Sequence, residues 1–141
     1  MIKATQPIVI VDADSIVAQV SANDSNHKKT FLLSEKLKSS KARIIYPVTA
    51  ILEAVTVLQK KESSVLAHAV ANLLMPSKVE VVQIDDEILT SAMIYFEPTK
   101  SKKNTLFDCI IMAIADDYET DIIFSFDKFY KKQGYRLVGD L

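Results

Sequence analysis

The amino-acid sequence predicts an α/β protein with three layers, α/β/α, around a mainly parallel central sheet. Short apolar runs, typical of strands buried on both faces, alternate along the chain with longer amphipathic runs that are typical of helices. Such alternation favours right-handed crossovers, which make a sheet parallel and place helices on both of its faces. The 141 residues can bury roughly 68 to 70% of the surface of the unfolded chain. We therefore expect one domain over residues 1–141.

The predicted strands are short and rich in β-branched residues. The N-terminal segment has one charge and then a short apolar run with no small-residue cleavage pattern after it, so we interpret it as a strand and not as a signal peptide. Pro47 stops the second strand, since proline is unfavourable within a sheet, and Gly134 precedes the last. The predicted strands cover residues 8–11, 42–46, 79–84, 122–126 and 135–138.

The predicted helices have apolar residues at spacings of three and four. One apolar stripe of this kind consists of Ile51, Leu52, Val55 and Leu58. The next helix ends before Pro76, because the residue that precedes a proline is driven out of the helical region. The predicted helices cover residues 29–41, 49–61, 64–75, 85–96 and 105–118; a further helix-compatible segment opens at residues 12–15, and the stretch PTKSKKN, residues 98–104, is the most loop-like.

The composition excludes several kinds of site and partner. With one cysteine, Cys109, and two widely separated histidines, the chain lacks the residue spacings of zinc sites. The net charge of −1 gives no general indication of nucleic-acid binding. Basic runs in segments 28–43, 100–103 and 128–136 fit either solvated faces or contacts with a phosphate backbone. No apolar stretch is long enough to span a membrane, so we expect a soluble, cytoplasmic protein without a membrane partner.

Four acidic residues stand out because each interrupts or closes an apolar run. Asp12 and Asp127 directly follow strand-like runs, whereas Glu53 and Asp108 lie in the first turns of helix-like runs. Ligands of parallel sheets bind beyond the carboxyl ends of the strands, and helices that follow such strands begin at the same edge. If the fold brings these side chains together, they form a carboxylate cluster that requires a cation.

Each acid also has an explanation in local structure alone. Asp12 or Asp14 fits as the N-cap of the first helix, and Glu53 would stabilise its helix by about 0.3 to 1 kcal/mol through the macrodipole. Asp108 completes a T-x-x-D capping box, and Asp127 fits an ordinary turn. Taken singly, these residues do not require a functional site.

Taken together, the acids favour a metal site. Two carboxylates about 4 Å apart repel each other by roughly 1 kcal/mol in water and by about 4 kcal/mol at the effective dielectric of a protein surface. A divalent cation offsets this repulsion. Oxygen ligands without histidine or cysteine select a hard ion, Mg²⁺ or Mn²⁺, and such sites typically act on phosphates.

Four segments, in this order, resemble the motifs of PIN-domain proteins, a family of metal-dependent ribonucleases that includes the toxins of VapBC toxin–antitoxin pairs. The segments are IVIVDADSIV, VTAILEAVTVL, NTLFDCIIMAIADDY and IIFSFDKFYKKQGYRLV. Matched to this pattern, the acidic set of the family falls on Asp12, Glu53, Asp108 and Asp127.

Two positions depart from the pattern. Ser125 stands where threonine is commoner in the family, and Asp14 stands where the family usually has asparagine or serine. For the additional carboxylate of Asp14, three roles are open: it binds a second metal, alters the metal affinity or caps the helix.

The resemblance implies a PIN-like fold and the hydrolysis of RNA phosphodiester bonds. In the implied reaction, Mg²⁺ or Mn²⁺ activates the attacking water molecule, and the products carry a 5′-phosphate and a 3′-hydroxyl. In this scheme Asp12, Asp108 and Asp127 hold the metal directly or through water. Glu53 holds the metal or orients the attacking water, and Ser125 supports the site by hydrogen bonding. The resemblance also implies a homodimer and, for a toxin, a small antitoxin protein as partner.

Two other hypotheses stay open. The D-x-D sequence of Asp12 and Asp14 after an apolar strand also resembles the first motif of haloacid-dehalogenase-type phosphatases, in which Asp12 would be the nucleophile and Asp14 the general acid. That assignment leaves Glu53 and Asp108 without a role. The third hypothesis is a catalytically silent PIN-like module that binds RNA or a protein, although the presence of all four acids argues against a degenerate site.

Overall fold

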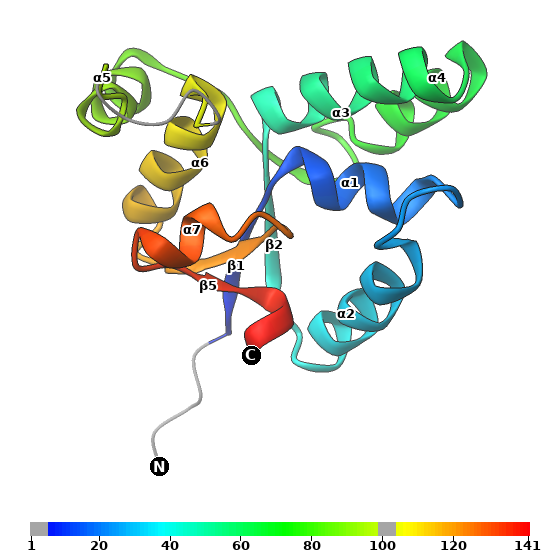
Figure 1. Ribbon diagram of the computed structural model, residues 1–141, viewed down its shortest axis with the longest axis horizontal. Helices are drawn as coiled ribbons and strands as arrows, with labels where there is room; N and C mark the ends of the chain where they lie inside the picture. The colour runs from blue at the N-terminus through cyan, green and yellow to red at the C-terminus, as the bar shows by residue number, and fades with distance from the viewer. Residues whose placement is uncertain (1–5, 99–103) are drawn as a thin grey trace.

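The computed structural model describes residues 6–98 and 104–141 and confirms the predicted fold class. Within these residues, five strands form one parallel sheet in the order β3-β2-β1-β4-β5, with helices on both of its faces (Figure 1). The strands are β1 (Ile8–Val11), β2 (Arg43–Pro47), β3 (Glu80–Val82), β4 (Ile122–Phe124) and β5 (Arg136–Leu137).

Seven α-helices and one short 3-10 helix connect the strands within the described residues. They are α1 (Ala13–Val20), α2 (His27–Ser39), α3 (Val48–Lys61), α4 (Ser64–Leu73), α5 (Asp86–Tyr95), α6 (Leu106–Asp117), α7 (Phe129–Lys132) and η1 (Val138–Asp140). Among these described helices, none is both long enough and apolar enough to cross a membrane.

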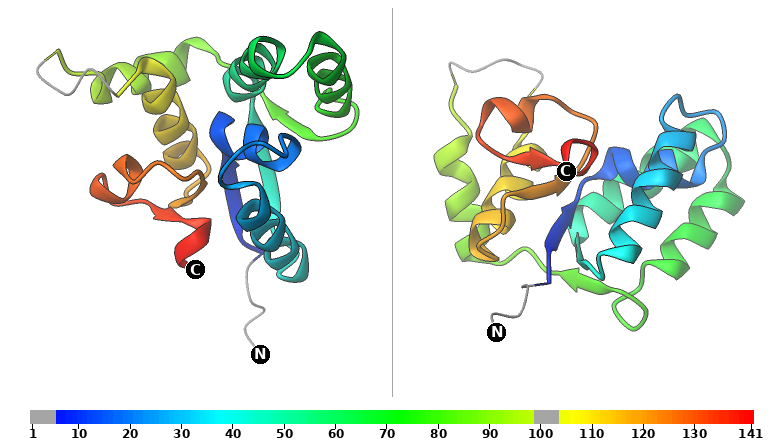
Figure 2. Two further views of the ribbon diagram at one scale, coloured as in Figure 1. Left: turned by 45° about the vertical axis from the view of Figure 1, so that its right-hand side comes forward. Right: turned by 90° about the horizontal axis from the view of Figure 1, so that it is seen from below.

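The helices divide into two layers because the chain reverses its direction across the sheet. From β1 the chain moves outward to β2 and β3, and it then returns to place β4 on the other side of β1. With right-handed crossovers, connections made before and after such a reversal lie on opposite faces. Accordingly, α1 to α4 lie on one side of the sheet, and α5 and α6 lie on the other (Figures 1 and 2).

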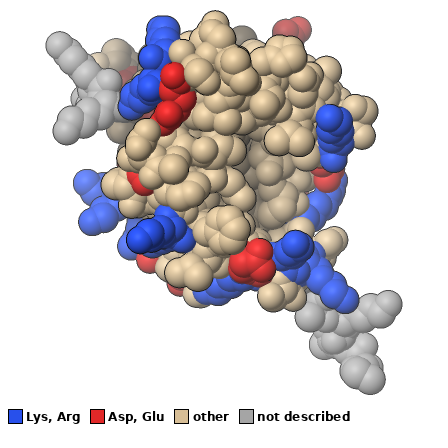
Figure 3. All heavy atoms as spheres, turned by 90° about the vertical axis from the view of Figure 1, so that its right-hand side faces the viewer, with Lys and Arg blue, Asp and Glu red and all other residues tan. Residues whose placement is uncertain are grey.

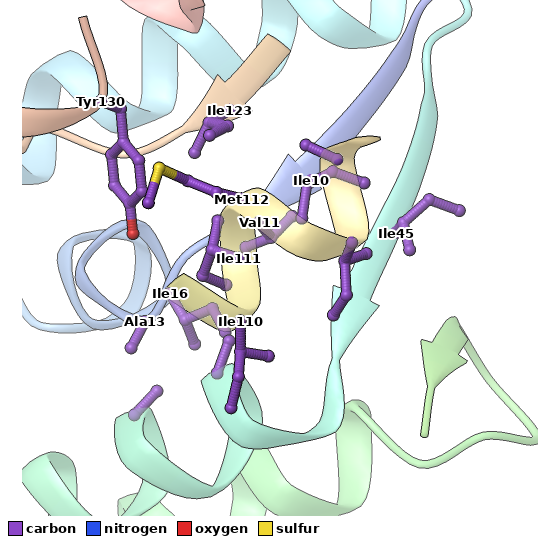
Figure 4. Packing of buried hydrophobic residues seen from close by; sticks show 14 of the residues in the cluster. Ile10, Val11, Ala13, Ile16, Ile45, Ile110, Ile111, Met112, Ile123 and Tyr130 are labelled. Atoms are coloured by element: carbon purple, nitrogen blue, oxygen red, sulfur yellow. The ribbon is translucent and has the colours of Figure 1, made fainter. Parts of the chain in front are cut away.

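Helix α6 is the buried centre of the fold. Its residues 109–115 are all buried, which includes Cys109. One side of the helix packs against α5 and another against β1, and Figure 4 shows Ile110, Ile111 and Met112 among apolar side chains of the sheet. Because both sides are covered, the helix is apolar around most of its circumference and not along a single stripe.

Several predicted elements differ from the structure at their ends, and one helix was not predicted. Strand β4 ends at Phe124 and not at residue 126, because the Phe126 N–H donates to a side chain, the Oδ2 atom of Asp14 (2.8 Å), and so leaves the ladder of the sheet. The last strand covers only two residues, since the chain turns into η1 at Val138. Helix α7 was not predicted: its four residues make a single turn, which is too short to show a helical period. The predicted loop at residues 98–104 lies largely outside the described residues.

Burial of one stripe of α3 predicts unequal effects of two leucine substitutions in that helix. Leu58 is fully buried, whereas Leu52 is 60% exposed. Leu58→Ala is expected to lower the free energy of unfolding by about 2 to 5 kcal/mol, because it leaves a cavity in the core. The matched change Leu52→Ala is expected to cost no more than about 0.5 kcal/mol. Urea unfolding of both variants measures these values, and equal losses would contradict the described packing of α3.

Candidate active site

The candidate site lies at the carboxyl ends of β1 and β4, where the order of the strands reverses. In open parallel sheets, this is where ligands bind. The two strands pair in parallel, and the Asp12 N–H donates to the Phe124 carbonyl oxygen at 3.0 Å. The segment after β1 and the segment after β4 are therefore joined, although they are far apart in the sequence.

Asp12 is the most buried acid of the site, with 8% of its surface exposed. It is the N-cap of α1: its Oδ1 accepts from the Ala13 N–H at 2.8 Å, and its Oδ2 accepts from the Tyr130 hydroxyl at 2.7 Å. Burial raises the pKa of Asp12 to about 7, and the charge of Asp14 adds to the increase, while both hydrogen bonds oppose it. The expected capping role is correct for this residue, and it leaves the carboxylate inside the protein.

Asp14 joins α1 to the segment that follows β4. Its Oδ2 accepts from the Ser125 hydroxyl at 3.0 Å and from the Phe126 N–H at 2.8 Å, and burial raises the pKa of this carboxyl group. The N-cap is Asp12, so the capping role considered for Asp14 is wrong. The Oδ1 atom of Asp14 is buried and has no hydrogen-bond partner among the described residues.

Asp108 has the local role that its sequence context predicts and a further contact. Its Oδ2 accepts from the Thr105 N–H at 3.0 Å, while its own N–H donates to the Thr105 hydroxyl, which completes a capping box at the start of α6. Its Oδ1 lies 3.2 Å from the Tyr130 hydroxyl. Burial raises the pKa of Asp108, and the charge of Asp127 adds to the increase.

Glu53 and Asp127 reach the same region from two other elements. Glu53 lies in the second turn of α3, beyond the first turn in which the macrodipole acts; burial raises its pKa, and the charges of Asp108 and Asp14 add to the increase. Asp127 is exposed and forms the predicted turn, since its Oδ1 accepts from the Phe129 N–H at 2.9 Å. The Asp127 N–H donates to the hydroxyl of Ser125 at 3.1 Å.

The structure therefore brings the six sequence-predicted residues into one electrostatically connected group. In four of the acids, burial is the largest cause of a raised pKa, and the charge of at least one other member raises it further. These four acids are Asp12, Asp14, Glu53 and Asp108. Ser125 connects the group, because its hydroxyl donates to Asp14 and accepts from the Asp127 N–H. Such a group is a place where positive charge is favourable.

The oxygen atoms of this group fit a hard divalent cation, because five of its members offer carboxylate oxygens and Ser125 offers a hydroxyl oxygen. The buried Oδ1 of Asp14 is an acceptor that a cation or its water would satisfy. Among residues 6–98 and 104–141, however, no three or more Asp, Glu, His or Cys side chains are arranged so that they could hold a metal ion. The chemistry of the residues thus fits Mg²⁺ or Mn²⁺, while their positions do not form a coordination shell.

The sequence reasoning did not identify Tyr130 as a member of this group. Its side chain is fully buried, and its hydroxyl contacts both Asp12 and Asp108. Burial, followed by the charge of Asp12, raises the pKa of Tyr130 far above its ordinary range, so the hydroxyl keeps its proton and acts as a donor. Only one indication of this role was present in the sequence, a tyrosine three residues after Asp127. Helix α7 is a single turn, so its sequence pattern is too short to predict the direction of the Tyr130 ring.

The acidic group does not line the cavity on the α1–α4 side of the sheet. A cavity of about 460 Å³ lies between the sheet and helices α1, α2 and α4, and its walls include Val11, Ile16, Leu37 and Tyr46. None of the six sequence-predicted residues lines it. Figure 3 shows this side of the molecule, where uncharged side chains predominate at the centre and Lys and Arg lie nearer the edges.

Comparison with known proteins identifies a family model and a solved structure that are similar to this chain. Residues 9–134 match the family model of the PIN domain. The structure is similar to the crystal structure of VapC20 from Mycobacterium tuberculosis, described as a sarcin-ricin loop cleaving toxin, with a TM-score of 0.78 and 17% sequence identity. The similarity covers 91% of this chain and 96% of that chain, and at this identity it shows a common fold. No curated protein sequence gives a significant match.

Burial of Asp12 predicts that the stability of the metal-free protein falls as the pH rises. The folded pKa of about 7 lies above the value of 3.8 for an ordinary aspartate. The folded state therefore binds more protons between these values, and its extra stability is complete below about pH 4 and is lost as the pH rises through about 7. The loss is on the order of a few kcal/mol, at about 1.4 kcal/mol for each pKa unit.

Asp12→Asn is expected to make this dependence clearly shallower, because asparagine keeps the N-cap but has no charge. Asp121→Asn is the control. The hydrogen bonds from Arg136 lower the pKa of Asp121, so its carboxylate stays charged over the same range, and the slope is expected to match that of the wild type. Urea unfolding at several pH values in EDTA measures the slopes, and a slope for Asp12→Asn equal to that of the wild type would contradict the buried position of Asp12.

Proposed function

This chain belongs to the PIN-domain family, and from that premise we propose that it is a metal-dependent endoribonuclease that hydrolyses RNA phosphodiester bonds. The observation that carries the proposal is the group of carboxylates at the ends of β1 and β4, whose pKa values are raised by burial and by one another's charges. Buried like charges are unfavourable without a counter-charge. A divalent cation supplies that charge, and the phosphate backbone of RNA is a substrate such a site is suited to.

In this proposal, the residues have distinct roles around one or two cations. Asp12, Asp108 and Asp127 hold the cation directly or through water, and Glu53 holds it or orients the attacking water. When bound, Mg²⁺ or Mn²⁺ lowers the pKa of water and offsets negative charge at the reacting phosphate. Ser125 maintains the arrangement, since its hydroxyl bonds both Asp14 and the N–H of Asp127.

Contacts with RNA would come from lysines near the acidic group. The Lys29 Nζ atom lies 5.7 Å from the centre of the Phe126 ring, which stands between Ser125 and Asp127 in the sequence. Lys128 follows Asp127 directly. In the proposal, these two cations attract a phosphate backbone to the protein. Since RNA is the proposed substrate, the proposal includes a cytoplasmic location.

The partners follow from the family and from the structural neighbour. VapC20 is described as a toxin, and we extend the proposal to a toxin of a toxin–antitoxin pair, with a small antitoxin protein that holds the enzyme inactive and a homodimer as the active form. Detection of a small protein that copurifies with the chain and suppresses its nuclease activity would support this part of the proposal.

A second candidate function is a silent module that binds RNA or a protein without cleaving it. One observation favours it: within the described residues, the acids do not form a ready coordination shell. The phosphatase hypothesis has less support. Its nucleophile, Asp12, is buried with both oxygens in hydrogen bonds, and its general acid, Asp14, is directed toward Ser125 and Phe126.

Ribonuclease assays of matched variants test the proposal. In the presence of Mg²⁺ or Mn²⁺, the wild type is expected to cleave a mixture of RNA substrates, and EDTA is expected to abolish cleavage. Asp108→Asn is expected to lower the rate by at least about 100-fold, the upper end of what loss of an outer-shell partner costs. Asparagine retains an oxygen for the Thr105 N–H, so the capping box is kept.

The control is Asp117→Asn, which neutralises an exposed acid at the other end of the same helix and is expected to cleave at the wild-type rate. Equal rates for Asp108→Asn and the wild type would identify a contaminating nuclease or a different site. RNA binding by the wild type without cleavage would favour the silent module. Turnover of a small phosphomonoester that Asp14→Asn abolishes would favour the phosphatase.

A further inference from the structure

Tyr130 lies between two carboxylates of the acidic group. Its hydroxyl is 2.7 Å from Asp12 Oδ2 and 3.2 Å from Asp108 Oδ1. A hydroxyl has a single hydrogen to donate, so the shorter contact, to Asp12, is the stronger hydrogen bond and the contact to Asp108 is weaker. In Figure 4 the ring lies beside Met112, and the hydroxyl oxygen is directed toward the start of α1, where Ala13 is labelled.

Packing alone does not account for this hydroxyl. The ring is fully buried and lies 5.6 Å from the ring of Phe129. A phenylalanine would fill the same space without the cost of burying a polar group, which is small only when that group is hydrogen-bonded. The hydroxyl is bonded, and its partners are the two carboxylates. Its effect is therefore on Asp12 and Asp108.

The hydrogen bonds hold both carboxylates at two points. The Oδ1 of Asp12 accepts from the Ala13 N–H, and the Oδ2 of Asp108 accepts from the Thr105 N–H. The other oxygen of each carboxylate contacts the Tyr130 hydroxyl. A carboxylate has about four acceptor sites, so these contacts fix its direction and still leave lone pairs for a cation. The same hydroxyl also links α1, which Asp12 caps, to α6, which begins beside Asp108.

We propose that Tyr130 is a positioning residue, whose hydroxyl holds the carboxylates of Asp12 and Asp108 beside each other in the metal-free protein, so that a divalent cation can draw both into its coordination shell. This inference rests on the proposed function, since it concerns the metal site of the same reaction. Hydrogen-bond donors to ligating carboxylates are typically worth about 10- to 100-fold in metal affinity. Tyr130 contributes no ligand and carries out no chemical step.

Calorimetric titration of the purified protein with MnCl₂ tests the inference. Tyr130→Phe keeps the ring and removes only the hydroxyl, and it is expected to weaken Mn²⁺ binding about 10- to 100-fold. The matched control is Tyr135→Phe, because the Tyr135 hydroxyl also donates to a carboxylate, that of Asp116 (2.7 Å), at the other end of α6. This control is expected to bind Mn²⁺ with the affinity of the wild type.

The outcomes separate the two proposals. Wild-type binding that Tyr130→Phe leaves unchanged would overturn the role of Tyr130 and leave the metal-dependent nuclease standing. Absence of Mn²⁺ binding by the wild type would overturn both. An equal loss of affinity in Tyr130→Phe and Tyr135→Phe would indicate a general loss of structure and would also overturn the specific role of Tyr130.

A spectroscopic measurement can still overturn the inference if Tyr130→Phe fails to fold. Mg²⁺ does not absorb in the near ultraviolet, so a change in tyrosine absorption during titration reports on the surroundings of a tyrosine ring. Tyr130 is one of five tyrosines. The wild type and Tyr135→Phe are expected to show the same Mg²⁺-induced difference spectrum. A wild type that binds Mg²⁺ without any tyrosine signal would overturn the inference.

Discussion

The parallel pairing of β1 with β4 is the constraint on which the site depends. It joins the first strand of the chain to one that begins more than a hundred residues later, and the Asp12 N–H extends the pairing by one further hydrogen bond to Phe124. Because both strands end at the same edge, Asp12 and Asp14 meet the turn that contains Ser125 and the following residues. The strand order also reverses at this pair, and ligands of open parallel sheets generally bind at such a reversal.

Local structural roles and the proposed function support each other in this protein. Asp12 caps α1 and Asp108 completes the capping box of α6, and each of these bonds holds one carboxylate oxygen while the other stays directed toward the centre of the group. The helix ends thus position acids that repel one another. The repulsion persists, as the raised pKa values indicate, and it favours a cation at this place.

Much of the fold was predictable from local patterns. The apolar run IVIV identified β1 within its observed bounds, and the apolar circumference of α6 identified the most buried helix. Predictions were wrong where tertiary contacts override the local pattern. Strand β4 is shorter than its apolar run because Asp14 binds the Phe126 N–H, and Asp14 does not cap α1 because Asp12 precedes it in that position. Helix α7 is one turn long, so no period could be read from it.

The sequence by itself determined the order and type of the elements and the identity of the acids, because burial periodicity, helix caps and proline effects act between residues close together in the chain. Only the tertiary structure decided which groups touch. The contact between Tyr130 and Asp12 spans 118 positions, and that between Ser125 and Asp14 spans 111. Such contacts depend on which strands pair and which faces the helices cover, and these arrangements result from packing of the whole chain, which no single segment encodes.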